Sequence, residues 1–404
     1  MCIRDSLPPA LAVVNPNRQD ESGDLSHLCA AAVVFLLLVE VRRQLRDAGR
    51  GSPDLIALLD LVALATVADV APLVGVNRAF VRQGLKIMAR RERVGLTALA
   101  DVAGLDTAPT TYHLGYVLGP RVNAGGRIGA ADLGARLLAT QDPHEAQALA
   151  EKLDHLNRER RDIEASVRAA ALSQAEDRGL DRALVWAAGP AWHPGVVGIV
   201  ASRLKETAGR PSIVIGIEDG IGKGSGRSVS GIDLGQPIQR LAAEGLLLKG
   251  GGHKMAAGLT VAEDKIEEAM ARLTQFLEKQ GAHELGPTDL KVDGLLGVDA
   301  ATVELVAQIE QAGPFGAAAP APRFVFADSE IRYAKRVGEN HLKVSCCSGA
   351  ARIDAIAFGA FDTAIGPALE NHGGARFHLA GRLETNTWRG RQRVQVRLED
   401  VARA

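Results

Sequence analysis

The segment at residues 192–203 has the sequence WHPGVVGIVASR, and its surroundings decide how the fold is interpreted. It lies between two apolar stretches, ALVWAA at 183–188 and SIVIGI at 212–217, and each of these is typical of a buried strand. The segment itself predicts a helix that continues to Thr207, with Pro194 suited to its first turn. Strand, helix and strand in this order predict a β-α-β unit, and the amides at the start of such a helix can bind an anion.

The composition limits the classes of protein that fit this sequence. Its 404 residues suit two or three domains, and 47% hydrophobic with 24% charged residues is typical of a globular protein. The 47 Lys and Arg residues nearly cancel the 48 Asp and Glu residues, so a nucleic-acid site has to be a local basic patch. Four cysteines without metal-ligand or disulfide spacing favour a reducing cytoplasm. The most apolar run, at residues 30–39, is too short to span a membrane, so we expect no membrane association.

Hydrophobic periodicity divides the chain into five parts. Short apolar strands, including one at 11–15, alternate with helices in the first part, which predicts α/β layering. A long amphipathic helix follows, either as a spacer between domains or as an ordinary surface helix. After Gly286, alternating stretches at 341–346, 352–358, 376–383 and 391–398 predict a barrel of about five strands with the size of an OB-fold. The predicted boundaries are 1–6, a short first stretch; 7–141, the first α/β part; 142–180, the connecting helix; 181–283, the second α/β part; and 284–404, the barrel.

Three glycine-rich segments are interpreted as turns that could hold phosphate groups. They are GPRVNAGGR at 119–127, GKGSGRS at 222–228 and KGGGHKMAAG at 249–258. Arginine offers a bidentate fork to phosphate oxygens, and glycines free backbone amides to join it. A solvated loop or a tight turn would explain the same composition. GKGSGRS does not match the P-loop pattern, which disfavours hydrolysis of nucleoside triphosphates.

Two further segments are candidates for chemistry or binding. Asp69 in TVADV (66–70) ends an apolar segment before Pro72, where either a metal-binding carboxylate or a simple turn aspartate fits. In the β-rich tail, three arginines share one face of a predicted strand, and two more residues stand just before it. Cations beside an aromatic ring suit single-strand binding, although a solvated strand face would also explain them. These residues are Arg391, Arg393 and Arg397 on the strand and Trp388 and Arg389 before it.

Taken in order, these segments resemble the RecJ-type single-strand DNA exonucleases of the DHH phosphoesterase superfamily. HPGVVGIVASR, GKGSGRS and GGHKMAAG resemble the DHH-associated domain, TVADV and PRVNAGGR resemble the back half of the DHH domain, and GPFG at 313–316 resembles the start of the OB domain. The resemblance implies an α/β fold class. Its parts are a partial DHH-type domain with a parallel sheet, a long linking helix, a DHH-associated α/β domain and a C-terminal OB-like barrel.

The resemblance also implies roles for individual residues. Asp69 would be a ligand of a Mn²⁺ or Mg²⁺ pair, and Arg121, Asn123 and Arg127 would face DNA near the scissile phosphate. The residues implied to hold the 5′ phosphate are His193, Ser225, Arg227, Ser228, Gly251, Gly252 and His253. The implied reaction is 5′-to-3′ hydrolysis of single-stranded DNA by a metal-activated water, in DNA repair and recombination. A single-strand-binding protein is a partner expected from the family alone, because no motif in this sequence carries it.

Residues 1–6 match nothing in this family and are interpreted as an unrelated leader. The sequence also departs from the family pattern in its metal ligands. The first aspartate motif and the Asp-His-His triplet are absent, and one carboxylate cannot hold two divalent ions. We therefore expect a truncated chain that is catalytically silent or nearly so. Two alternatives remain open: a non-catalytic scaffold that binds single-stranded DNA, and a DHH phosphodiesterase that acts on short oligonucleotides. The β-rich tail argues for long DNA.

Overall fold

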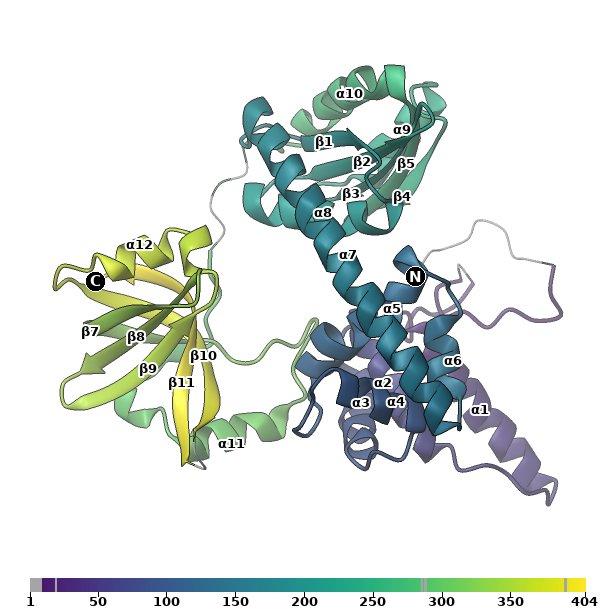
Figure 1. The fold of residues 1–404 in the computed structure, drawn as a ribbon, viewed down its shortest axis with the longest axis horizontal. Coiled ribbons are helices and arrows are strands. Elements are labelled where there is room, and N and C mark those ends of the chain that lie inside the picture. Colours follow the sequence, from purple (N-terminus) through teal and green to yellow (C-terminus); the bar gives the residue numbers. More distant parts are fainter. Residues whose placement is uncertain (1–8, 19, 285, 287–288, 389–390) are drawn as a thin grey trace. The chain divides into compact units, whose positions relative to one another are not determined.

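The computed structural model describes residues 9–18, 20–284, 286, 289–388 and 391–404 (Figure 1). The leader predicted at 1–6 lies outside these residues. The chain forms two compact units. The first unit comprises Met1–Arg90, Pro109–Gly115 and Thr288–Ala404, and the second comprises Arg91–Ala108 and Tyr116–Pro287.

The N-terminal part of the first unit is helical. It contains α1 (Ala30–Asp47), a short 3-10 turn (Ile56–Leu58), α2 (Leu59–Ala68) and α3 (Gly75–Met88). Helices α2 and α3 approach closely at Gly84, where a Cβ atom would lie 2.2 Å from the carbonyl oxygen of Leu59. Phe35 of α1 packs edge-on against Phe80 of α3, with ring centroids 5.3 Å apart. Buried apolar residues therefore join the three helices around one core.

The strand predicted at 11–15 is wrong. No strand forms among the described residues before Val185. A strand needs a neighbour to pair with its N–H and C=O groups. Here Leu11 is fully exposed instead, and the carbonyl of Val13 accepts a hydrogen bond from the side chain of Arg18.

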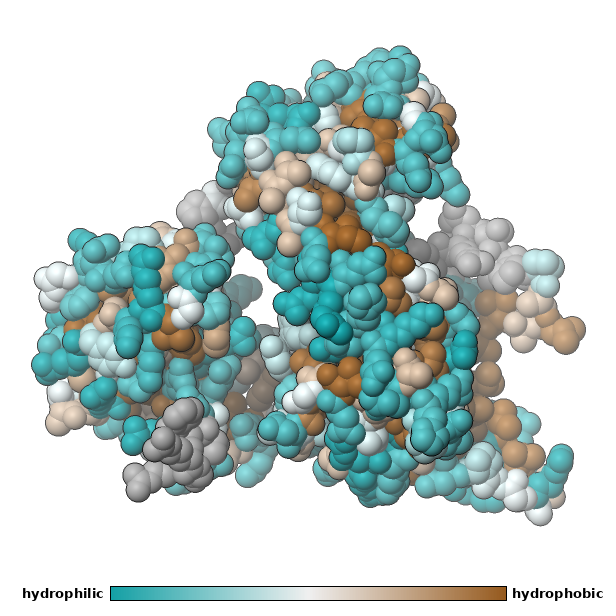
Figure 2. Space-filling model, in the orientation of Figure 1, coloured by the Kyte–Doolittle hydropathy of each residue, from teal (hydrophilic) through white to brown (hydrophobic). Residues whose placement is uncertain are grey.

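Helix α1 leaves part of its apolar surface uncovered. Val34, Leu37, Val39 and Val41 are each more than two-fifths exposed, and hydrophobic residues colour this helix brown in Figure 2. Over the described part of the chain, no helix has the length and apolar character that a membrane crossing requires.

The C-terminal part of the first unit is a closed five-stranded barrel, as predicted. Strand β7 pairs with β8, β8 with β9, β9 with β11 in parallel, β11 with β10, and β10 again with β7. The strands are β7 (Phe324–Val337), β8 (His341–Ser348), β9 (Ala351–Ala357), β10 (Arg376–Trp388) and β11 (Arg391–Arg403). The short β6 (Gly294–Leu295) and α11 (Val303–Ala312) precede the barrel, and α12 (Ile365–Glu370) connects β9 to β10.

The second unit consists of four helices followed by an α/β sheet. The helices are α4 (Val94–Val102), α5 (Gly119–Ile128), α6 (Leu133–Ala139) and the long α7 (Pro143–Arg178). The sheet elements are β1 (Val185–Pro190), α8 (Pro194–Ala208), β2 (Ser212–Glu218), β3 (Ile221–Arg227), α9 (Gly235–Ala243), β4 (Lys249–His253), β5 (Ala256–Ala262) and α10 (Ile266–Glu278). The strand order is β1-β2-β3-β5-β4, with only β1 and β2 parallel, so the predicted β-α-β unit and the long helix are confirmed.

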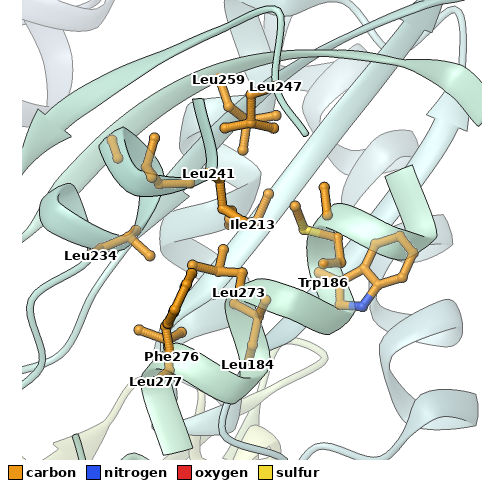
Figure 3. Packing of buried hydrophobic residues seen from close by; sticks show 14 of the residues in the cluster. Leu184, Trp186, Ile213, Leu234, Leu241, Leu247, Leu259, Leu273, Phe276 and Leu277 are labelled. Carbon is orange, nitrogen blue, oxygen red and sulfur yellow. The ribbon is translucent and has the colours of Figure 1, made fainter. Parts of the chain in front are cut away.

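Helices cover the two faces of this sheet unequally. On one face α9 and α10 cover the sheet, and Leu234, Leu241, Leu273 and Phe276 pack there against Ile213 of β2 (Figure 3). On the other face α7 and α8 pack over β1, β2 and the near side of β3. The remaining half of that second face, formed by β3, β5 and β4, is where the candidate site lies.

Most residues of the three glycine-rich segments lie in helices or strands, and only Lys254 and Met255 form a predicted turn, between β4 and β5. Residues 222–227 belong to β3, residues 249–253 and 256–258 form the hairpin of β4 and β5, and residues 119–127 belong to α5. Their glycines serve close packing: a Cβ atom at Gly125 would lie 2.9 Å from the carbonyl oxygen of Ala130, and one at Gly250 would lie 2.9 Å from Ile238. The glycine content of these segments therefore reflects close contacts between elements that are distant in the sequence.

Candidate anion-binding site and nucleic-acid interface

Strand β3 alternates between a packed face and an open face. A Cβ atom at Gly226 would lie 2.6 Å from Leu234, and one at Gly224 would lie 2.9 Å from Leu259, so both glycines face the core. Because successive residues of a strand point to opposite faces, Lys223, Ser225 and Arg227 point to the open face. The glycines thus let α9 approach the sheet while the polar residues stay accessible.

Strands β5 and β4 extend this open face. Arg227 pairs with Ala256, which pairs with His253, and Ser225 pairs with Gly258, which pairs with Gly251. Directly opposite residues share a face of the sheet. A Cβ atom at Gly251 would meet nothing within 4 Å, so the backbone there is bare. Gly251 and Gly258 therefore form a surface without side chains, here called the glycine floor, and Arg227 and His253 lie beside it.

Helix α8 begins beside this floor. His193 caps it, with Nδ1 accepting a hydrogen bond of 3.0 Å from the amide of Gly195, so the proton of the neutral ring is on Nε2 and can be donated elsewhere. One turn later, a Cβ atom at Gly198 would lie 3.1 Å from both Arg227 Nη2 and Ser225 Oγ. Arg227 Nη1 in turn donates to Ser225 Oγ at 2.9 Å. The first turns of α8 and the end of β3 therefore frame one cradle.

Arg127 reaches the same cradle from α5. Its Nη1 donates to the carbonyl of Gly195 at 3.2 Å, and a Cβ atom at Gly195 would lie 2.3 Å from the carbonyl oxygen of Arg127. Only glycine permits this approach of the α5 backbone to the start of α8. Two motifs that are 68 residues apart in the sequence are thus joined by a direct contact.

The cradle has an excess of positive charge. Burial, and then the charge of Arg127, lowers the pKa of Arg227 below its ordinary value. Burial, and then the charge of Arg160, likewise lowers the pKa of Arg127, while Glu164 raises it. Neither Arg127 nor Arg227 forms an ion pair with a carboxylate among the described residues. Guanidiniums that are partly desolvated, mutually repelling and without a carboxylate partner are arranged to bind an anion.

Helix α7 supplies the third guanidinium. Arg160 is buried, donates to Glu164 and to Asn157 Oδ1 at 3.2 Å, and its Nε has no partner among the described residues. Asn157 is itself buried. The pKa shifts of Arg127 and Arg227 thus involve the guanidiniums of Arg127, Arg160 and Arg227. They also involve one carboxylate, that of Glu164.

Other predicted residues are engaged elsewhere. Arg121 is bound by Asp154 Oδ1 at 2.9 Å and by the carbonyl of Val117 at 2.7 Å. Asn123 is exposed on α5. Ser228 is buried, and its hydroxyl donates to the carbonyl of Ile232 at 2.8 Å, so that hydroxyl holds the chain after β3 and does not face the cradle. Gly252 packs tightly against β5, because a Cβ atom there would lie 2.5 Å from the Cα atom of Ala257.

Asp69 lies in the first unit, in the turn after α2. The amide of Val70 donates to the carbonyl of Val67 and that of Ala71 to the carbonyl of Thr66, which closes the helix with a Schellman motif. Val70 occupies the left-handed position of this motif with φ of 55° and is 71% exposed. A β-branched residue is strained there and gains little from burial. Asp69 is exposed and lies directly before Val70, so this hydrogen-bonded turn sets its position.

The barrel carries a groove with a volume of about 1280 Å³. Three cations line it, Lys343, Arg352 and Arg393, and Asp354 lies 3.4 Å from Lys343 and 3.7 Å from Arg352. Its other lining residues are Ala301, Thr302, Val303, Ile353, Asn386, Val394 and Gln395. Hydrophilic residues cover much of the visible face of the barrel (Figure 2).

The arginines predicted on β11 do not all line this groove. Arg393 does, whereas Arg397 is exposed, lies 3.7 Å from Glu384 and stacks over Phe358 at 5.5 Å from the ring centroid. The side chains of Trp388 and Arg391, and the whole of Arg389, lie outside the described residues.

Comparisons with known proteins agree with this architecture. Residues 181–279 match the DHHA1 domain family, and residues 292–400 match the RecJ OB domain family. The single-stranded-DNA-specific exonuclease RecJ of Dickeya dadantii is 40% identical, over 98% of this chain and 71% of its own length. The chain belongs to the RecJ family. The RecJ of Bacillus subtilis is 32% identical and is covered over 49% of its length. RecJ of Thermus thermophilus, solved in complex with Mn²⁺, aligns with a TM-score of 0.76 at 32% identity, over 92% of this chain and 52% of that one.

Divalent metals occur in the solved RecJ relatives, with Mn²⁺ in one Thermus structure and Mg²⁺ in another. Over the described residues, no group of three or more His, Cys, Asp or Glu side chains is placed to hold a metal ion. Each such ion takes six or more oxygen ligands, and Asp69 offers one carboxylate. The described residues therefore do not fit a complete two-metal centre, although Asp69 fits the role of one ligand.

Sequence reasoning missed several residues of these sites. Gly198 and Gly258 were not singled out, and only the three-dimensional contacts show that their missing side chains open the cradle. The strict alternation of glycine with polar residues in β3 was a usable signal, since it has the period of a strand. Lys343 and Arg352 gave no local signal, because the closure of the barrel brings them beside Arg393.

Proposed function

We propose that this chain binds and processes the 5′ end of single-stranded DNA, as part of an exonuclease that hydrolyses phosphodiester bonds in the 5′-to-3′ direction. The observation that carries the proposal is the cradle formed by Arg127, the start of α8 and the end of β3. RecJ relatives that align over 98% of this chain, at 38% and 40% identity, are named single-stranded-DNA-specific exonucleases.

The charge of the cradle favours a terminal phosphate over an internal one. A phosphomonoester carries about −1.5 to −2 charges near pH 7, whereas an internal phosphodiester carries about −1. Two guanidiniums without carboxylate partners among the described residues, Arg127 and Arg227, are better neutralised by the more charged group. His193 Nε2, Ser225 Oγ and the amides in the first turn of α8 supply further donors.

The glycine floor supports the same assignment. With no side chains at Gly251 and Gly258, a nucleotide can lie directly on the sheet beside His253. We assign Gly251 and His253 to substrate binding on this basis, and Lys223 joins them because it lies on the same face, whereas Gly252 packs against β5.

The barrel groove is proposed to bind the rest of the strand. Among its lining residues, Lys343, Arg352 and Arg393 are three cations against the single Asp354, and cationic grooves on OB-type barrels bind single strands with little sequence preference. We keep Arg391, Arg393 and Arg397, with Trp388 and Arg389, as proposed DNA contacts, and we add Lys343 and Arg352.

Catalysis is proposed to need Mn²⁺ or Mg²⁺ with Asp69 as one ligand, and such ions would supply the activated water. Arg121 and Asn123 are retained as residues near the scissile phosphate. The described residues complete no metal site, so we propose that this chain alone is nearly silent in hydrolysis. The same observation favours the second candidate function, a non-catalytic scaffold that binds single-stranded DNA. Binding to a single-strand-binding protein remains a proposal from the family.

The test measures binding and digestion on the same oligonucleotides. Fluorescence anisotropy reports binding of single-stranded DNA with a 5′ phosphate or a 5′ hydroxyl, and gel analysis of 5′- and 3′-labelled strands with Mn²⁺ reports hydrolysis. Preference for the 5′ phosphate supports the cradle assignment, and progressive loss from the 5′ end supports the exonuclease. Asp69→Asn is the matched control, because it should stop any cutting without weakening binding. Tight binding without cutting agrees with either function for this chain, progressive loss from the 5′ end would exclude the scaffold, and failure to bind single strands would exclude both functions.

A further inference from the structure

Helix α11 lies between the barrel groove and the turn that carries Asp69. At its N-terminal end, Thr302 caps the helix through a 3.2 Å hydrogen bond from the amide of Leu305, and Thr302 and Val303 line the groove. Its ten residues give a rod about 15 Å long. Its C-terminal end is held by α3, the helix that follows the Asp69 turn.

Two arginines of α3 fix that C-terminal end. Arg82 donates to the carbonyls of Gln311 and Gly313. Arg78 donates from Nη1 to the carbonyl of Ala312 at 3.4 Å and from Nε to the carbonyl of Leu73 at 3.0 Å. The last carbonyls of a helix have no partners within it and carry partial negative charge, which guanidiniums satisfy well. Arg78 therefore ties the end of α11 directly to the end of the Asp69 turn.

The residues after α11 hold the same turn from another side. The amide of Leu73 donates to the carbonyl of Ala317 at 2.8 Å, and Leu73 is only 1% exposed. A Cβ atom at Gly316 would lie 2.6 Å from Leu73 Cδ1, so the backbone of Gly316 rests on that side chain. Thr111 Oγ1 donates to the carbonyl of Phe315 at 2.9 Å. Leu73 is thus fixed through its amide, its carbonyl and its side chain.

We propose that α11 with residues 313–317 is a positioning strut that couples occupancy of the barrel groove to the order of the Asp69 turn. This inference rests on the proposed binding of single-stranded DNA in the groove. DNA that contacts Thr302 or Val303 biases the position of α11. A change in that position alters residues 70–73 through the hydrogen bonds of Arg78 and Arg82 and through the contacts of Leu73. The GPFG segment at 313–316 is then a positioning element of the nuclease and more than a linker.

Hydrogen exchange at the Leu73 amide tests the coupling, because that amide donates to Ala317. We expect saturating oligo-dT to slow its exchange about fivefold in the unsubstituted chain, the lower end of typical coupling between sites. Lys343→Met in the groove should remove this effect.

Substitutions in the strut should separate binding from coupling. In Arg78→Met with Arg82→Met, oligo-dT should still bind but no longer slow exchange at Leu73. Thr111→Val removes only the hydrogen bond from Thr111 Oγ1 to the carbonyl of Phe315 and should reduce the effect of oligo-dT on Leu73. Thr111→Ser keeps a hydroxyl and should retain that effect. Arg203→Met is the matched control, since Arg203 is exposed in the second unit and pairs there with Glu206.

The outcomes are distinguishable. If oligo-dT does not bind, the proposed function fails and the strut fails with it. If oligo-dT binds through Lys343 and exchange at Leu73 is unchanged, the strut alone is refuted. It is also refuted if the Arg78 and Arg82 variants retain the full effect on Leu73.

Discussion

Replacement of Arg227 by Met should weaken binding of a 5′-phosphorylated strand without destabilising the fold. Met keeps an unbranched apolar stem but removes the charge and the hydrogen bonds to Ser225 Oγ and the carbonyl of Gly226. A hydrogen bond to a charged group contributes about 1.5–3 kcal/mol, which corresponds to roughly 10- to 150-fold in affinity. The salt dependence should also become shallower, with the slope of log K against log salt falling by about 1.

The expected effect on stability has the opposite sign. Burial and the neighbouring Arg127 lower the pKa of Arg227 in the folded protein, which means that the charged form is disfavoured there relative to the unfolded chain. Removing the charge relieves that cost, so the melting temperature should stay level or rise. Most substitutions of half-buried residues lower the melting temperature. A loss of affinity without a fall in melting temperature is therefore specific to a binding residue.

The assay combines anisotropy with 5′-phosphate and 5′-hydroxyl oligonucleotides, a salt titration and thermal unfolding. Arg203→Met on α8 is the control, because Arg203 forms an exposed pair with Glu206 at the far end of the helix. Equal loss of affinity for both oligonucleotides would show that Arg227 does not contact the terminal phosphate. A fall in melting temperature with unchanged affinity would show that Arg227 is structural, and the cradle would be refuted.

Three other substitutions test separate parts of the argument. Gly198→Ala should weaken 5′-phosphate binding, because its Cβ would lie 3.1 Å from Arg227 Nη2 and from Ser225 Oγ and would crowd both groups; anisotropy measures the loss, and unchanged affinity would count against the cradle. Val70→Gly should raise the free energy of unfolding by about 1 kcal/mol by releasing the left-handed strain at an exposed residue, and a lower denaturant midpoint would contradict the assigned turn. Burial raises the pKa of Cys346 to about 12 from 9.0, so its contribution to stability is complete below pH 9 and is lost as the pH rises toward 12, because only the unfolded chain releases the proton in that window. Cys346→Ala should therefore flatten the fall in melting temperature above pH 9, and an unchanged slope would refute the assigned pKa.

The β-α-β unit, the long helix and the barrel could be predicted because their signals are local. Apolar residues repeat with the period of a helix in α7 and with the period of a strand in β8, β9 and β11, and each pattern specifies its element without knowledge of its neighbours. The predicted strand at 11–15 failed for the opposite reason, since a strand depends on a pairing partner that its own residues do not provide.

The roles of the glycine-rich segments could not be predicted from local sequence patterns. Gly226 is needed because Leu234 of the next segment packs on β3, and Gly195 because the backbone of Arg127 crosses it, and neither neighbour can be inferred from the motif alone. The sequence by itself determined the β-α-β unit, the long helix, the barrel strands, the family resemblance and most of the residues with anion-binding chemistry. Only the tertiary structure decided that Arg127, His193, Ser225 and Arg227 share one cradle and that the hydroxyl of Ser228 does not. The physical reason is that propensity and periodicity act over a few residues, whereas a binding site is made by close packing between segments far apart in the chain.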